Sequence, residues 1–139
     1  MISESRYWKE PLLEAADWLE SVRLRERTKE ETLVRIEREV FVSFYAIRKL
    51  FETLKVSDKT KEMTINIEWH PNVDPVNHLN SIHLDRLYDF GKTSTETRKA
   101  LFLCHQFVHS FIFSPFEEYG VLGGFFVTSD QTKDEKLYR

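Results

Sequence analysis

A chain of 139 residues, 41% hydrophobic and 14% aromatic, can bury a sizeable core, and we expect one globular domain, residues 1–139. Its net charge of −3 lacks the basic excess of a protein that binds duplex DNA. Cys104 is the one cysteine, which excludes an internal disulfide and fits a reducing compartment. The sequence shows neither a signal peptide nor an apolar run near the roughly 20 residues of a membrane span. We therefore expect a cytoplasmic protein without membrane contact.

Two long amphipathic helices are predicted in the first 55 residues. Apolar residues in the first helix, about 4–27, recur at steps of four and three: Trp8, Leu12, Ala15, Leu19 and Val22. Thr28 and Glu31 then form a capping-box pattern that opens the second helix, which reaches about residue 55. A short turn between two long helices predicts that they pack antiparallel.

The later segments predict shorter elements. Residues 63–69 alternate as a strand, 70–75 form a loop with two prolines, and 82–90 form a short helix. A second capping-box pattern at 93–96 opens a helix over 98–113 that Pro115 ends, and strands follow at 125–128 and 137–139. The predicted fold is α+β and mainly α: an antiparallel bundle of two long N-terminal helices and one later helix, with a small antiparallel sheet.

The helix predicted over 98–113 carries three basic side chains along one stripe. At 100° per residue, Arg98, His105 and His109 fall near one line of a helix that is otherwise almost wholly apolar. Polar groups in such a helix need partners, so the stripe is a candidate site. The alternative is structural: the histidines are buried against the second helix, at Glu37 or Tyr45, and Arg98 is solvated or paired with Glu96 or Asp89.

Zinc chemistry is not expected at this stripe. Two histidines four residues apart can chelate a metal, but Gln106 stands where a zincin helix has its catalytic glutamate. A structural zinc would need two further ligands, and no recognisable spacing supplies them from His70, His78, His83, Asp74 or Asp85. We expect no metal and no cofactor.

The same stretch resembles the terminal helix motif of HEPN domains, helical bundles that often act as ribonucleases. That motif is an arginine followed after a short spacer by a histidine, frequently with a polar residue directly after the arginine. Arg98 and His105 fit the spacing, with Lys99 as the polar residue. In the other register His109 is the histidine and His105 the polar residue, and Cys104 stands where the motif has arginine.

More widely, segments 44–50, 103–110 and 124–130 resemble a family of bacterial proteins that has asparagine at the position of His105. That resemblance implies no established activity. The HEPN resemblance implies a metal-independent endoribonuclease, often dimeric, with His105 or His109 as general acid or base. Arg98 would hold the phosphate of RNA or a nucleotide, helped by Lys99 and Arg48.

The other candidate function is a non-enzymatic protein-interaction module, such as a subunit or antitoxin-like partner in a bacterial defence or regulatory system. The acidic balance and the imperfect motif favour it, and an exposed aromatic patch would mark its surface.

Three further features are interpreted as structural rather than functional. Cys104 is expected to be a core thiol, and residues 70–83 are expected to be a surface loop. Two basic sets are expected to form solvated faces with ion pairs: Arg35, Arg38, Arg48 and Lys49 on the second helix, and Arg23, Arg25, Arg27 and Lys29 before it.

Overall fold

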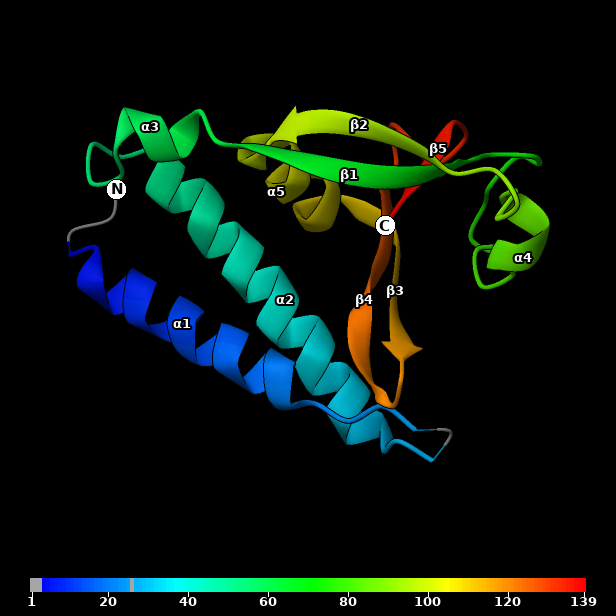
Figure 1. The fold of residues 1–139 in the computed structure, drawn as a ribbon, viewed down its shortest axis with the longest axis horizontal. Coiled ribbons are helices and arrows are strands. Elements are labelled where there is room, and N and C mark those ends of the chain that lie inside the picture. Colours follow the sequence, from blue (N-terminus) through cyan, green and yellow to red (C-terminus); the bar gives the residue numbers. More distant parts are fainter. Residues whose placement is uncertain (1–3, 26) are drawn as a thin grey trace. The chain divides into compact units, whose positions relative to one another are not determined.

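The computed structural model describes residues 4–25 and 27–139, and the chain divides into two compact units. The first unit comprises residues up to 63 together with 115–124, and the second comprises 64–114 and 125–139. The fold is α+β, and its five-stranded antiparallel sheet is a substantial part of it (Figure 1). The predicted helical bundle with only a small sheet is therefore wrong.

Two helices, α1 (Arg6–Ser21) and α2 (Glu30–Phe51), form the hairpin of the first unit, and a single turn, α3 (Asp58–Lys61), follows. The Lys9 ammonium donates to the Lys55 carbonyl at 3.1 Å, and the Arg35 guanidinium lies 4.0 Å from the Trp18 ring centroid. The residues buried along the two helices are Ala15 in α1 and Ile36, Val40, Ala46 and Leu50 in α2; all of them except Ala46 come from the predicted apolar stripes.

The turn between α1 and α2 differs from the predicted capping box. Lys29 is the N-cap of α2, and no side chain caps it. The Thr28 hydroxyl bonds instead to both backbone groups of Arg25, at 2.7 Å each. Val22 and Leu24 are buried because this segment is extended and pairs with residues 120–122. Since side chains alternate along an extended chain, the intervening basic residues are left exposed.

The sheet runs in the order β2-β1-β5-β4-β3 (Figure 1). Its strands are β1 (Thr64–Pro71), β2 (Ser94–Lys99), β3 (Ser110–Glu118), β4 (Val121–Ser129) and β5 (Lys136–Tyr138). Two helices interrupt the strands, α4 (Leu84–Leu87) and α5 (Ala100–Val108). The turn between β3 and β4, with the adjacent ends of both strands, belongs to the first unit.

The helix predicted over 98–113 is wrong at both ends. Residues 94–99 form a strand, because Thr95 and Thr97 are β-branched and the segment has a partner in β1; the expected capping box at 93–96 is absent. Helix α5 covers only 100–108, and β3 follows directly. Pro115 lies inside β3 rather than ending a helix, which an edge strand tolerates because the missing N–H is not needed there.

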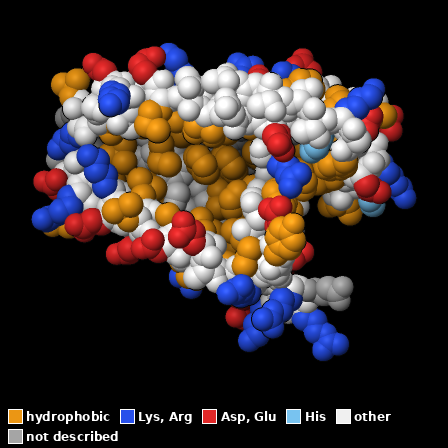
Figure 2. Space-filling view, viewed as in Figure 1, with side chains coloured by type: hydrophobic (Ala, Val, Ile, Leu, Met, Phe, Trp, Pro, Cys, Tyr) orange, Lys and Arg blue, Asp and Glu red, His pale blue; other side chains and the backbone are white. Residues whose placement is uncertain are grey.

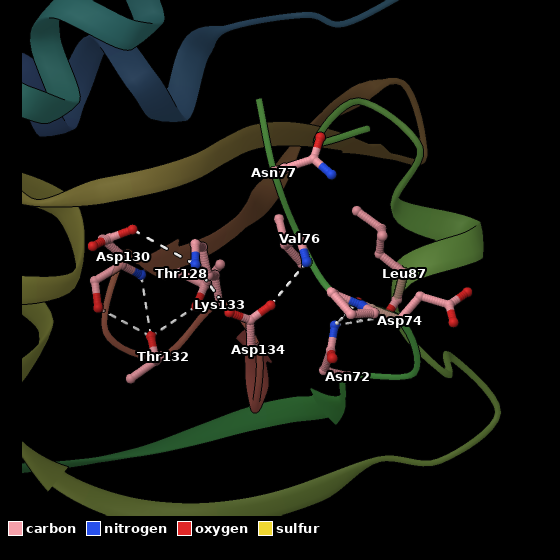
Figure 3. A network of polar contacts seen from close by, with 12 residues as sticks. Asn72, Asp74, Val76, Asn77, Leu87, Thr128, Asp130, Thr132, Lys133 and Asp134 are labelled. Atoms are coloured by element: carbon pink, nitrogen blue, oxygen red, sulfur yellow. Dashed lines mark hydrogen bonds and ion pairs between the residues drawn. The ribbon is translucent and has the colours of Figure 1, made fainter. Parts of the chain in front are cut away.

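The loop predicted at 70–75 starts later than expected, since His70 and Pro71 belong to β1. The segment that follows is tied to the β4–β5 turn by polar contacts (Figure 3). Asp134 accepts a hydrogen bond from the Val76 N–H at 2.8 Å, and Asn72 donates to the Leu87 carbonyl at 3.0 Å. These bonds satisfy backbone groups outside the sheet and hold the loop over a core cluster of Val76, Leu87, Tyr88, Ile112 and Leu137.

Candidate functional site

Arg98 lies in β2, not on the helix, so it does not share a helical stripe with His105 and His109. Its Nε donates to a Glu96 carboxylate oxygen at 2.8 Å, and its guanidinium lies 4.4 Å from the Phe102 ring centroid. The structural alternative, pairing of Arg98 with Glu96, is confirmed. The phosphate-binding arginine that the motif requires is thus already engaged by a carboxylate.

Glu96 is the centre of a cluster on the sheet face next to α5. Partial burial would raise its pKa, but hydrogen bonds from Tyr138, Arg98 and Lys136 outweigh this, and the pKa lies below its ordinary value. The Lys136 ammonium is 3.3 Å from Glu96 and 4.5 Å from the Trp69 ring centroid. A carboxylate stabilised in this way is a poor general base, and the cluster ties β2 to β5 across β1.

His105 and His109 do come together, with ring centroids 4.8 Å apart. The His109 N–H closes the last turn of α5 on the His105 carbonyl at 3.0 Å, so both rings project from the end of that helix. His105 is half-buried and His109 is exposed, which makes the buried alternative wrong for His109. Two neighbouring imidazole rings carry N–H groups that can donate hydrogen bonds to one anion.

No metal centre is found. Among residues 4–25 and 27–139, no group of three or more His, Cys, Asp or Glu side chains is arranged to hold a metal ion. Within that part of the chain, the two histidines of α5 have no arrangement of further ligands that a zinc site would need.

Gln106, which stands where a zincin has its general base, has a structural role. Its side chain is 1% exposed, and its Oε1 accepts from the Ser129 N–H at 3.0 Å and from the Thr132 hydroxyl at 2.9 Å. Cys104 on the same helix is fully buried, as expected for a core thiol. The inward side of α5 thus anchors the end of β4 and carries no accessible reactive group among these residues.

Arg98 and Lys99, two residues of the predicted phosphate-binding set, do not share a face of the sheet. Arg98 and Lys99 are consecutive strand residues, so their side chains leave opposite faces of the sheet. Arg48 lies on α2 in the first unit, with its Nε 4.0 Å from Glu52, and Lys49 is 3.5 Å from the same carboxylate. The expectation of an ion-paired, solvated face is confirmed for Arg48 and Lys49.

His70 is a buried polar residue that sequence analysis placed in a loop. It is 2% exposed, its Nδ1 is 3.0 Å from the Lys92 carbonyl, and Phe90 packs against its ring at 4.8 Å. With the Nδ1 proton donated to that carbonyl, Nε2 faces no hydrogen-bond partner among the described residues. Its aromatic surroundings are those of a core histidine rather than a catalytic one.

Sequence analysis missed a surface feature between α1 and α2, here called the hairpin groove. It has a volume of about 240 Å³, and it is lined by Tyr7, Trp8, Pro11, Leu12, Glu39, Val42, Ser43 and Ala46. Tyr7 is 65% exposed and Val42 is 64% exposed. Neither residue follows the apolar spacing that predicted the core of the hairpin. Apolar residues outside that spacing were the sequence signal that could have revealed the groove.

The surface around the hairpin is charged. In Figure 2, acidic side chains follow the edge along which α1 runs, and Lys and Arg side chains gather at the turn between α1 and α2. Helix α1 carries Glu10, Glu14, Asp17 and Glu20 against Arg6 and Lys9, a net charge of −2. The hairpin therefore presents an apolar groove beside an acidic helix.

Comparison of the chain with protein-family models, with curated proteins and with solved structures found no match. In the part of the chain that the structure describes, no helix is both long and apolar enough to cross a membrane.

Proposed function

We propose that this protein is a non-enzymatic interaction module whose α1–α2 hairpin receives a basic amphipathic helix of a protein partner. The hairpin groove carries this proposal, because it exposes large apolar side chains on otherwise charged helices. The engagement of Arg98 by Glu96 and the structural role of Gln106 weigh against the catalytic alternative.

The size of the groove favours side chains of a partner over a small molecule. Its volume of about 240 Å³ is below the roughly 300 Å³ at which pockets for drug-sized ligands begin. A groove between two packed helices is a surface onto which a third helix can dock, with apolar residues spaced at i, i+3, i+4 and i+7. Tyr7 and Val42 would meet those residues from the two sides of the groove.

The charge of the partner follows from the hairpin. Helix α1 has a net charge of −2, and Glu39 lines the groove itself. Opposite charges at the rim of an interface raise the association rate and select against like-charged partners. We therefore expect a helix with lysine or arginine on the sides of its apolar face.

A direct test uses a synthetic amphipathic Leu/Lys peptide and the full chain. We expect the peptide to shift the NMR signals of groove residues and the fluorescence of Trp8, which lines the groove. A peptide of the same composition, reordered so that its apolar face is lost, should not bind. Failure of both peptides, or equal binding of both, would contradict the proposal.

A matched pair of variants locates the binding surface. Val42→Asp places a carboxylate in the groove, and the bound peptide would bury this charge without a partner. The free energy needed to desolvate the charge exceeds the contribution of a single hydrogen bond, so binding should weaken by about tenfold or more. Val73→Asp makes the same change at a 60% exposed position in the second unit and should leave binding unchanged. Equal effects of the two variants would place the interaction elsewhere.

A second candidate function is phosphate binding by His105 and His109, favoured by the 4.8 Å spacing of their rings and the exposure of His109. Adding inorganic phosphate or a short RNA should then shift both imidazole signals in NMR titrations near neutral pH. His109→Ala should abolish RNA binding or cleavage and leave the melting temperature nearly unchanged. Titration curves insensitive to both ligands would exclude this function.

A further inference from the structure

The strand β2 is an open edge of the sheet in the second unit. Its six residues pair with β1 from Ser94↔Trp69 to Lys99↔Thr64, and β2 ends the strand order. Every residue of β2 is exposed except Glu96, which is partly buried. A strand with a neighbour on one side leaves alternate N–H and C=O groups pointing outward, where another strand can pair. Beyond the pairing with β1, no backbone hydrogen bond joins Ser94–Arg98 to another described residue.

The strand is short and charged, which limits pairing, but it lacks the backbone features that block pairing outright. It contains neither proline nor glycine, its register with β1 runs through six consecutive pairs, and none of its residues has a positive φ. Its charged side chains would repel many strands, so the sequence of an incoming strand decides whether it fits. A second copy of the chain offers its own β2 as such a strand.

We propose that two copies of this chain associate by antiparallel pairing of their β2 strands, centred on Thr97. In this register Glu96 lies opposite Arg98 of the second copy, and Thr95 lies opposite Lys99. A centre at Glu96 would place Glu96 opposite Glu96, and a centre at Arg98 would place Arg98 opposite Arg98. Opposite charges across strands stabilise pairing and like charges oppose it, so the charges select the register at Thr97.

The existing contacts are compatible with this pairing. Glu96 and Arg98 leave the same face of β2, with 2.8 Å between Arg98 Nε and a Glu96 oxygen. Residues opposite each other in antiparallel strands share a face, so the two pairs from two copies form one group of four alternating charges. A guanidinium has five N–H donors, more than one carboxylate uses. The twofold axis is perpendicular to the sheet, and the α5 sides of both copies face the same way.

The association is expected to be weak. Six-residue strands bury far less than the roughly 1,000 Å² of a stable interface, so the dimer should dissociate on dilution. Sedimentation equilibrium of the full chain over a range of concentrations should therefore show a monomer–dimer equilibrium. A chain that stays monomeric up to its solubility limit would overturn the proposal.

Substitutions at Thr95 separate pairing between copies from stability within one copy. Thr95 lies opposite Glu68 in its own sheet and opposite Lys99 of the second copy in the proposed dimer. Thr95→Lys should therefore favour the monomer fold and weaken the dimer, about fivefold over two symmetric pairs. Thr95→Glu should do the reverse, with a less stable monomer and an about fivefold tighter dimer.

These opposite signs make the test decisive. Thermal unfolding at low concentration gives the effect on the monomer, and sedimentation gives the effect on the dimer. A dimer that neither variant changes uses another surface, and a dimer that Thr95→Lys tightens has another register. Either result overturns the proposal, and neither bears on binding at the hairpin groove, which belongs to the first unit.

Discussion

Replacing Gln106 by leucine removes an acceptor that α5 supplies to the end of β4. Gln106 Oε1 accepts two hydrogen bonds, from the Ser129 N–H and the Thr132 hydroxyl. Each is worth about 1 kcal/mol, and leaving a buried N–H unpaired costs about 1–3 kcal/mol. The Ser129 N–H keeps the Thr132 hydroxyl as a second acceptor at 3.1 Å, which limits the loss. We expect Gln106→Leu to lower the free energy of unfolding by about 2 kcal/mol.

The assay is thermal unfolding at fixed pH. With about 2.1 cal/mol/K of unfolding entropy per residue over 139 residues, this loss lowers Tm by about 7 °C. Gln131→Leu is the matched control, because it makes the same change at an exposed position of the β4–β5 turn and should shift Tm little. Equal shifts for the two variants, or a wild-type Tm for Gln106→Leu, would refute the assigned role of Gln106.

Three further predictions concern single contacts. The folded state stabilises the ionised Glu96 carboxylate, so the pKa of Glu96 lies below its ordinary value of 4.5. This contribution to stability is present above pH 4.5 and is lost as the pH falls through the folded pKa. Glu96→Gln should therefore lose less unfolding free energy in acid than the wild type does, and an equal loss would contradict this. Asp134→Ala should speed hydrogen exchange at the Val76 amide, which loses its acceptor, and unchanged exchange would exclude that bond as a restraint. Gly120→Ala should cost about 1 kcal/mol because φ is +80°, whereas Gly91→Ala, without a positive φ, should cost less in urea unfolding; the reverse order would contradict the turn geometry.

Sequence periodicity predicted the N-terminal helices but not the sheet. Long stripes identify α1 and α2 because many turns repeat the same spacing. The segment 94–99 has β-branched residues at only two alternate positions, Thr95 and Thr97. In addition, Thr93 and Glu96 have the spacing of a capping box, which predicted the start of a helix. Whether such a segment becomes a strand depends on a distant partner, here residues 64–69, which local spacing does not encode.

The predicted helical stripe of Arg98, His105 and His109 was wrong for the same reason. Placing Arg98 on a helix created the stripe with His105 and His109, and the strand removed it. The His105–His109 pair was predictable because both residues lie at the end of one real helix. The role of Gln106 was not predictable, since its partners Ser129 and Thr132 follow more than 20 residues later. Pro115 led to the wrong prediction of a helix end, because proline ends helices but is also accepted on an edge strand.

The pairing of residues 22–24 with 120–122 makes the first unit discontinuous in sequence. During synthesis the helical hairpin emerges first, but Val22 and Leu24 stay without their partners until most of the second unit has been made. Closing such a long loop is a slow, non-local step, and it couples the completion of one unit to the growth of the other. A cut between residues 63 and 64 would therefore not yield two self-sufficient halves: the hairpin would lose the strands that cover its turn.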